Sequence, residues 1–315
     1  MALDTASTQF LQQLADQGTP PFHSMTPTDA RAFFAGLREI IGEGPDMNRV
    51  GEHPIVSNDA TITVRTLVPS DKPEGIIVYL HGGGWVVGAL DDYDTLARFM
   101  AAESNCVVAM VDYRLAPEYP YPAAVEDAWA ALQWVASNRS LIAGESGIGL
   151  PLFVAGDSAG GNLAAVVARK AGASGRPELA KQILIYPVTQ PNFSTAGYLA
   201  PENQGLLSRE DMIYFWNHYI PDSTKRREPD ASPLLAEDLK GLAPATVLIA
   251  EHDVLSDEGA AYAEHLKSFG VPVTLRRFHG QIHGFFSILN ALPESKTARQ
   301  FVVDEIRRVI AKTSV

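Results

Sequence analysis

Ser158 lies in a sequence context that suits a catalytic nucleophile. It stands between Gly156 and Gly160 in the pattern G-x-S-x-G, after an apolar run (152–155) and before a helical pattern. A serine on such a strand-to-helix turn holds its hydroxyl out of the sheet, and small residues two positions away let the chain turn that tightly. The pattern therefore predicts a nucleophilic serine rather than a packing turn.

A serine hydroxyl is a weak nucleophile, so a general base held by a carboxylate must activate it. Both groups should come from loops that follow later strands. "TVLIAEHD" ends in Asp253, and "VTLRRFHGQIHGF" carries His279 and His283. We expect Asp253 and one of these histidines to lie beside the serine.

The stretch "HGGGWVVG" (81–88) contains four glycines directly after the apolar run 75–80. Attack on an ester carbonyl creates an oxyanion, which needs N–H donors aimed at it in a dry site. Glycines let the backbone approach such a group without a Cβ in the way. We expect donors from Gly83 and Gly84, and a third from Ala159 at a helix N-terminus, where partial positive charge collects.

A metal site is the main alternative reading of the two histidines. His279 and His283 are four residues apart, which would suit a metal pair on a helix. Gly280 and Gly284 argue against a helix there, and the motif H-E-x-x-H is absent. We therefore predict no metal site.

Four other side chains near these motifs have simpler expected roles. Asp257 competes with Asp253 as the acid, but it stands where a helix N-cap is expected. Asp157 is expected to be a carboxylate in the first turn of the helix after Ser158. His81 is expected to anchor the glycine loop rather than transfer protons. Trp85 either lines the pocket or packs beneath it, and the sequence leaves both open.

Short apolar runs alternate with helical patterns from residue 75 onward. Nearly continuous apolar runs are typical of parallel strands that are buried on both faces. The runs are 75–80, 106–111, 152–155, 182–186 and 246–250, and an alternating strand pattern precedes them at 61–68. This alternation predicts an α/β sheet with helices on both faces.

Two segments fall outside that alternation. Residues 1–50 predict two helices, and the second begins at Thr26 as N-cap. It carries an apolar stripe of Phe33, Phe34, Leu37, Ile40 and Ile41 and ends at Gly42. Residues 190–235 are rich in proline and contain one clear helix, 209–219. Ser208 and Asp211 are spaced as a capping box at its start.

These two segments predict a two-part helical cap over a catalytic core. The cap is expected to comprise 1–50 and 190–235, and the core 51–189 and 236–315. Packing of the two apolar faces on each other would form an apolar roof over the serine. The candidate substrate-binding residues are Trp85, Phe34 and Trp216.

Composition excludes several classes of protein. The chain has 315 residues and a formal net charge of −12, which argues against nucleic-acid partners and anionic membranes. Its one cysteine, Cys106, lies in an apolar run and is expected to be a buried thiol. The N-terminus lacks a signal-peptide pattern, and no apolar run approaches the roughly 18 residues of a membrane span. A cytoplasmic protein is expected.

The motifs "HGGGW", "DYRLAPEYPYPAAVED", "GDSAGG", "DVLSDEG" and "HGF" together resemble the hormone-sensitive lipase family of α/β-hydrolases. The GDSAG form is similar to the family's bacterial carboxylesterase branch. The resemblance runs from about residue 60 to the C-terminus, and it implies a mostly parallel sheet of about eight strands with a helical cap. It implies Ser158 as nucleophile, Asp253 as acid, and His283 as base, because the family's histidine directly precedes Gly-Phe. Val254 stands where the family usually has proline.

The resemblance implies a serine carboxylesterase that needs no metal or organic cofactor. The expected partner is a small-molecule ester of short to medium acyl length, with no nucleic acid and no membrane. The oligomeric state stays open, with a homodimer as one option. An amidase or formamidase on the same triad is the alternative, since an amide differs mainly in its leaving group. A non-catalytic receptor is disfavoured, because the related gibberellin receptors lack the histidine that is present here.

Overall fold

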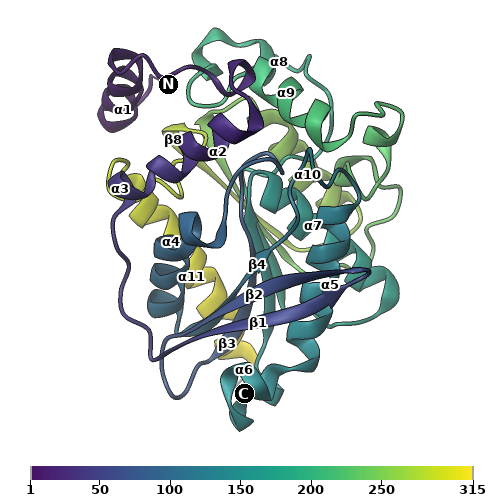
Figure 1. The fold of residues 1–315 in the computed structure, drawn as a ribbon. Helices are drawn as coiled ribbons and strands as arrows, with labels where there is room; N and C mark the ends of the chain where they lie inside the picture. The colour runs from purple at the N-terminus through teal and green to yellow at the C-terminus, as the bar shows by residue number, and fades with distance from the viewer. Residues whose placement is uncertain (1, 314–315) are drawn as a thin grey trace.

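Within residues 2–313, which the computed structural model describes, the strands form one eight-stranded sheet in the order β1-β2-β4-β3-β5-β6-β7-β8 (Figure 1). The strands are β1 (Arg49–Ser57), β2 (Ala60–Val68), β3 (Gly75–Leu80), β4 (Cys106–Asp112), β5 (Leu152–Asp157), β6 (Lys181–Ile185), β7 (Ala245–His252) and β8 (Val273–Ile282). β1 and β2 are antiparallel to their neighbours, and all pairs among β3 to β8 are parallel. The expected mostly parallel sheet is confirmed.

The central strands are built from the apolar runs. Every residue of β3, β5 and β6 is buried, because helices cover both faces of the sheet. Parallel strands present their carboxyl ends at the same edge of a sheet. The segments that follow β3, β5, β7 and β8 therefore meet at one edge, and these segments carry the residues predicted to do chemistry.

β1 is the strand that the sequence did not predict. It pairs with β2 as an antiparallel hairpin, with Ile55 opposite Ile62. Its outer residues include Val56, which is 76% exposed, and it contains Pro54. Proline and exposed residues are typical of edge strands and obscure the alternation that marks a buried one. The boundary between cap and core, expected between residues 50 and 51, falls inside this strand.

Helices cover both faces of the sheet (Figure 1). One face packs against α4 (Leu90–Ser104) and α11 (Glu294–Thr313). The other packs against α5 (Ala123–Ser137), α7 (Ala159–Ser174) and α10 (Ser256–Ser268), and a short α6 (Arg139–Ala143) follows α5. The two faces bury separate apolar cores, and the sheet carries the segments at its carboxyl edge.

The N-terminal segment (residues 2–48) folds as α1 (Thr5–Asp16), a 3₁₀ turn η1 (Phe22–Ser24), α2 (Pro27–Gly36) and α3 (Arg38–Ile41). Thr26 caps α2, since its side chain accepts a hydrogen bond from Asp29 N–H, as predicted. The helix expected to continue to Ile41 is interrupted at Leu37, which separates α2 from α3. Gly42 ends α3 with a φ of 73°.

The insertion (residues 190–235) between β6 and β7 contains α8 (Ala196–Leu199), α9 (Arg209–Tyr219) and short 3₁₀ turns. The capping box of Ser208 and Asp211 at the start of α9 is confirmed. The apolar face of α9 is buried; it comprises Met212, Phe215, Trp216 and Tyr219.

The N-terminal segment and the insertion pack on each other. Asp211 Oδ1 accepts a hydrogen bond from His23 N–H at 2.9 Å and lies 2.8 Å from His23 Nδ1. The rings of Phe22 and Phe215 lie 5.5 Å apart between centroids. The two amphipathic pieces thus bury their faces together, at the edge of the sheet where the strands' carboxyl ends meet.

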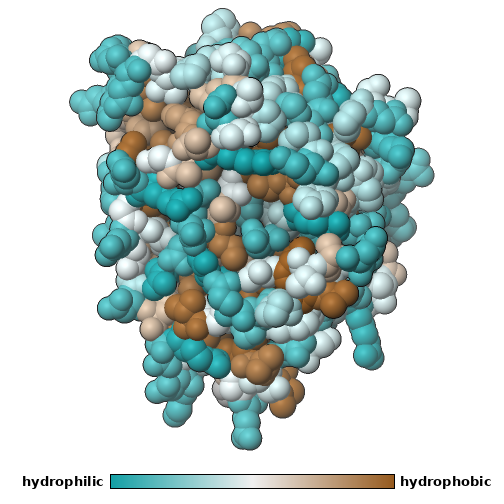
Figure 2. All heavy atoms as spheres, in the orientation of Figure 1, coloured by the Kyte–Doolittle hydropathy of each residue, from teal (hydrophilic) through white to brown (hydrophobic). Residues whose placement is uncertain are grey.

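One face of the molecule is mostly polar (Figure 2). Figure 2 shows a largely hydrophilic face on which hydrophobic atoms gather in small, separate patches. In the part of the chain that the structure describes, no helix combines the length and the apolar character that a membrane crossing requires. Cys106 is a buried free thiol, as expected.

Candidate active site

Ser158 makes the turn between β5 and α7. β5 ends at Asp157 and α7 begins at Ala159, and Ser158 has φ 54° and ψ −118°. A positive φ is strained for any residue other than glycine, so the surrounding packing must hold it. Gly160 allows this packing, because a Cβ there would overlap the carbonyl oxygen of Leu80 on β3. The turn brings the serine to the segments that follow β7 and β8.

Ser158, His283 and Asp253 form one hydrogen-bonded chain. His283 Nε2 lies 3.0 Å from Ser158 Oγ, and His283 Nδ1 lies 2.7 Å from Asp253 Oδ2. Asp253 is fully buried, and its second oxygen accepts the N–H of Leu255 at 2.9 Å. An imidazole in this position is oriented by the carboxylate and is within reach of the serine proton. The structure therefore brings the three predicted residues together.

The two rivals for these positions lie elsewhere. The side chain of His279 is 57% exposed, and its Nδ1 lies 3.3 Å from Glu251 Oε2. Asp257 lies in the first turn of α10, where its carboxylate accepts the N–H of Gly197 at 2.6 Å. The N-cap of α10 is Leu255, so the expected capping role of Asp257 is wrong.

The glycine loop (residues 81–88) follows β3 and lies beside the serine turn. Gly83 and Gly84 have φ values of 108° and 59°. Side chains rarely tolerate such values, and a Cβ on Gly83 would overlap the carbonyl oxygen of Val87. No residue among 2–313 accepts a hydrogen bond from the N–H of Gly83, Gly84 or Ala159. These three donors are thus available to a ligand.

His81 anchors the glycine loop, as predicted. Its Nδ1 lies 2.7 Å from the carbonyl oxygen of Gly82, and Tyr113 donates its hydroxyl to the carbonyl oxygen of His81 at 2.8 Å. Burial lowers the pKa of the His81 imidazole to about 4. The ring is therefore neutral at neutral pH, and its Nδ1–H donates to the Gly82 carbonyl.

Asp157 has a larger role than the sequence predicted. It is the last residue of β5, so its expected place in the first turn of α7 is wrong. Its carboxylate accepts hydrogen bonds from Tyr79 Oη at 2.8 Å, Gly82 N at 3.0 Å and Tyr93 Oη at 3.2 Å. Burial raises the pKa of this carboxyl to about 6. Asp157 ties the serine turn to the glycine loop.

An apolar cavity opens over Ser158 and His283. Three parts of the chain form its walls: the N-terminal segment, the insertion and the loops of the core. The lining includes Phe22, Phe33, Phe34, Leu37, Ile41, Gly83, Gly84, Tyr93, Asp157, Leu206, Leu207, Met212, Phe215 and Ile288. Phe34, a predicted substrate contact, lies in this wall and stacks on Tyr93 with ring centroids 6.0 Å apart.

Trp85 and Trp216 do not line the cavity, and their predicted contact with substrate is corrected. Both are fully buried. The Trp85 ring stacks on Tyr219 at 4.1 Å and 10°, and it meets Trp216 edge-on at 5.1 Å. The two tryptophans therefore pack α9 of the insertion against the glycine loop.

Several lining residues were not predicted as site residues. Phe33, Leu37, Ile41, Met212 and Phe215 belong to the two apolar stripes, so the stripes were a usable signal for them. Tyr93, Leu206 and Ile288 lie outside any pattern, and only the packing of the loops brings them to the cavity.

Comparison with known proteins places this geometry in a family. A family model described as alpha/beta hydrolase fold matches residues 77–287. This chain belongs to the hormone-sensitive lipase family of α/β-hydrolases. A carboxylesterase of Mycobacterium tuberculosis is 40% identical over 226 residues, which are 71% of this chain and 70% of that protein.

Two members match nearly the whole chain. An ethyl acetate hydrolase of Pseudomonas putida is 33% identical over 297 residues, 91% of this chain and 92% of that protein. The solved structure of a thermostable esterase from Pseudomonas putida superimposes with a TM-score of 0.91 at 38% identity and covers 98% of both chains. The resemblance inferred from the motifs is thus confirmed, and it extends to the N-terminal segment.

Proposed function

We propose that this α/β-hydrolase is a serine carboxylesterase that acts on short- to medium-chain acyl esters through an acyl-enzyme. The observation that carries the proposal is the hydrogen-bonded chain of Ser158, His283 and Asp253, which opens into an apolar cavity beside unpaired N–H donors. The esterase and carboxylesterase names of the relatives support the same reaction.

Acylation is the first half of the reaction. His283 Nε2 takes the proton of Ser158 Oγ as that oxygen attacks the ester carbonyl, and Asp253 stabilises the resulting imidazolium. The carbonyl oxygen becomes an oxyanion that accepts hydrogen bonds from the N–H groups of Gly83, Gly84 and Ala159. When the tetrahedral intermediate collapses, His283 returns the proton to the leaving alkoxide, and alcohol departs from an acyl-serine.

Deacylation repeats the same steps with water. His283 removes a proton from water as the water oxygen attacks the acyl carbonyl, and the same three N–H groups receive the oxyanion. Collapse expels Ser158 Oγ, which regains its proton from His283, and the carboxylic acid leaves. Apart from the ester and water, every group used in these steps belongs to the chain.

We propose further that the N-terminal segment and the insertion act as a cap that limits acyl length. Aromatic and branched side chains from both segments stand over the serine, among them Phe34 and Met212. An apolar cavity enclosed by bulky side chains favours acyl chains that fit within it over long-chain triglycerides.

The test is the rate of hydrolysis of p-nitrophenyl esters from acetate to palmitate. A maximum at short to medium length, abolished in Ser158→Ala, is the expected result. The matched p-nitroanilides form the second arm, because an amidase would turn these over at comparable rates. A folded wild-type protein that cleaves no ester, or one whose Ser158→Ala variant keeps its activity, would reject the proposal.

A further inference from the structure

Arg31 joins the N-terminal segment to the back of the glycine loop. Its side chain extends from α2, and its Nε donates to the carbonyl oxygen of Val86 at 2.8 Å. One of its terminal nitrogens donates to the carbonyl oxygen of Ala116 at 2.9 Å. Ala116 N–H in turn donates to the carbonyl oxygen of Trp85 at 2.8 Å. Arg31 thus holds two successive residues of the loop, Val86 directly and Trp85 through Ala116.

Glu118 keeps the guanidinium in this place. Its two carboxylate oxygens accept hydrogen bonds from the two terminal nitrogens of Arg31, at 2.9 Å and 2.6 Å. A bidentate pair of this kind fixes the plane of the guanidinium as well as its position. The hydrogen bond from Arg31 lowers the pKa of the Glu118 carboxyl to about 2, so both partners are charged throughout the neutral range.

The glycine loop needs such support because its conformation is strained. Trp85 has a φ of 61°, a left-handed value that costs a non-glycine residue about 1–2 kcal/mol. Within the loop, the N–H groups of Val86 and Val87 both donate to the carbonyl oxygen of Gly83. A shift of Val86 would therefore move Gly83, whose N–H is one of the three unpaired donors. The contacts that hold Val86 therefore bear on the direction of the Gly83 N–H.

We propose that Arg31 is a positioning residue through which docking of the N-terminal segment sets the geometry of the oxyanion donors. The inference rests on the proposed esterase function. It makes the cap a part of the catalytic machinery as well as a wall of the cavity, because the same α2 helix carries Phe34 into the cavity and Arg31 to the loop. An enzyme with α2 undocked would lose both this part of the cavity wall and the support of the oxyanion donors.

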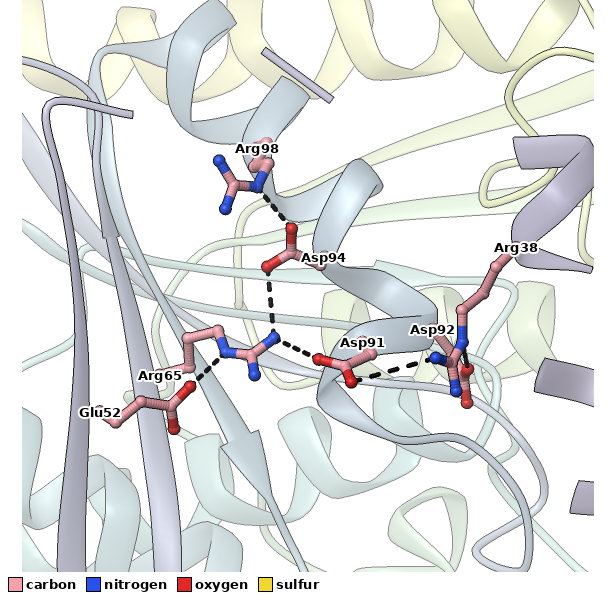
Figure 3. A network of polar contacts seen from close by, with 7 residues as sticks. All are labelled: Arg38, Glu52, Arg65, Asp91, Asp92, Asp94 and Arg98. Carbon is pink, nitrogen blue, oxygen red and sulfur yellow. Dashed lines mark hydrogen bonds and ion pairs between the residues drawn. The ribbon is translucent and has the colours of Figure 1, made fainter. Parts of the chain in front are cut away.

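Arg38 provides a matched control on the same segment. It begins α3 and pairs with Asp92 at 2.5 Å and with Asp91 at 4.0 Å, both in the first turn of α4. Figure 3 shows that Asp91 also meets Arg65, so that Arg38 belongs to a chain of ion pairs on the surface. Like Arg31, Arg38 ties the N-terminal segment to core carboxylates. Unlike Arg31, it makes no hydrogen bond to the glycine loop.

The experiment compares Arg31→Met with Arg38→Met in the full chain. Methionine keeps much of the apolar stem of arginine and removes all donors. With p-nitrophenyl butyrate, Arg31→Met is expected to lose about 10-fold to 10²-fold in kcat with KM within about twofold, as small misplacements of catalytic groups do. Arg38→Met is expected to keep its kcat. Glu118→Gln leaves Arg31 its carbonyl partners, so its kcat is expected to lie between those of Arg31→Met and Arg38→Met.

A second measurement separates positioning from general damage. A trifluoromethyl ketone adds to the serine and forms a tetrahedral oxyanion, whereas the matched methyl ketone binds without forming a stable adduct. The inhibition constant of the trifluoromethyl ketone should rise in Arg31→Met by about the factor by which kcat falls, because both report the oxyanion. The inhibition constant of the methyl ketone should stay unchanged.

The outcomes are distinct. If Arg31→Met is folded and its kcat and trifluoromethyl ketone affinity match those of Arg38→Met, the inference is overturned while the esterase function stands. If Arg31→Met melts below the assay temperature, Arg31→Gln, which keeps a short neutral donor, is judged by the same criteria. A wild-type protein that cleaves no ester rejects the proposed function itself.

Discussion

The carboxylate of Asp157 accepts a hydrogen bond from the backbone N–H of Gly82 at 3.0 Å, and this contact joins the two halves of the site. Asp157 directly precedes the nucleophile candidate Ser158, and Gly82 directly precedes Gly83. Two tyrosine hydroxyls donate to the same carboxylate. The serine turn and the glycine loop therefore share one buried acceptor.

Replacing that acceptor should impair catalysis. Asp157→Ala leaves three buried donors without a partner, at a cost of about 1–3 kcal/mol for each donor. We expect the glycine loop to shift and kcat to fall by about 10-fold or more. Asp157→Asn keeps the shape and one acceptor oxygen, so its loss should be smaller. Kinetics with p-nitrophenyl butyrate and urea unfolding test both variants, and wild-type kcat in Asp157→Ala would contradict this view.

The triad variants should each lose most of the activity. Ser158→Ala, Asp253→Asn and His283→Ala are expected to lower kcat by on the order of 10³ or more, and their losses should not add because the three act as a unit. His279→Ala is the control, since that side chain is exposed and pairs with Glu251. An inactive His279→Ala beside an active His283→Ala would show that the base is misassigned.

The glycine loop should not tolerate a side chain at Gly83. An added Cβ would overlap the carbonyl oxygen of Val87, and a φ of 108° is strained for alanine. Gly83→Ala is therefore expected to lose activity and to unfold at lower temperature than wild type. Gly149→Ala is the control, because nothing lies within 4 Å of a Cβ there. Thermal melts and kcat of both variants check this, and a Gly83→Ala protein as stable as Gly149→Ala would refute the steric argument.

The parallel core was predictable because burial on both faces leaves a direct trace in the sequence. The apolar runs 75–80, 152–155 and 182–186 mark strands β3, β5 and β6, and Gly156 and Gly160 mark the turn that presents Ser158. The chain order of the triad follows from the order of the strands whose carboxyl ends share one edge. β1 escaped prediction because an exposed edge strand carries no such trace.

Roles that depend on packing between distant segments were not predictable. Nothing in the local sequence of Asp157 distinguishes a strand end from a helix start, and its tyrosine partners are more than 60 residues away. An apolar side chain such as Trp85 suits both a cavity wall and the packing beneath it. Only the docking of α9 decides that Trp85 meets Tyr219 rather than substrate. Interaction partners far apart in sequence leave no local periodicity.

Glu258 should make stability depend on pH. It is buried on α10, and its Oε1 accepts the N–H of Thr189, directly before the insertion, at 2.6 Å. Burial, assisted by the charge of Asp253, raises the pKa of its carboxyl from 4.5 to about 8. The folded protein therefore binds a proton between these values that the unfolded chain releases. The free energy of unfolding is expected to fall as pH rises from about 4.5 to about 8.

Glu258→Gln removes this titration while keeping an acceptor oxygen for Thr189. Urea unfolding at pH 5, 6.5 and 8 should show the variant gaining stability relative to wild type as pH rises. Asp157 also titrates, but its titration changes the free energy of unfolding of both proteins alike, so it cancels in the difference between them. A stability difference that is constant over this range would exclude a raised pKa at Glu258.

Acyl-length preference should respond to Phe34. Its ring lies in the cavity wall and stacks on Tyr93, above the serine. Phe34→Ala removes the ring and enlarges the cavity, so kcat/KM should rise for octanoate and decanoate relative to acetate and butyrate. The p-nitrophenyl ester series gives this ratio directly, and the ratio is insensitive to the fraction of active enzyme.

Ile40→Ala is the control for Phe34→Ala. Ile40 lies on α3 in the same N-terminal segment and is partly buried, but it does not line the cavity. Its removal should weaken the packing of the segment by about 1 kcal/mol or more without changing the space over Ser158. The two variants therefore separate loss of packing from change of cavity shape. If both shift the acyl-length profile alike, or if neither does, Phe34 does not set the length limit.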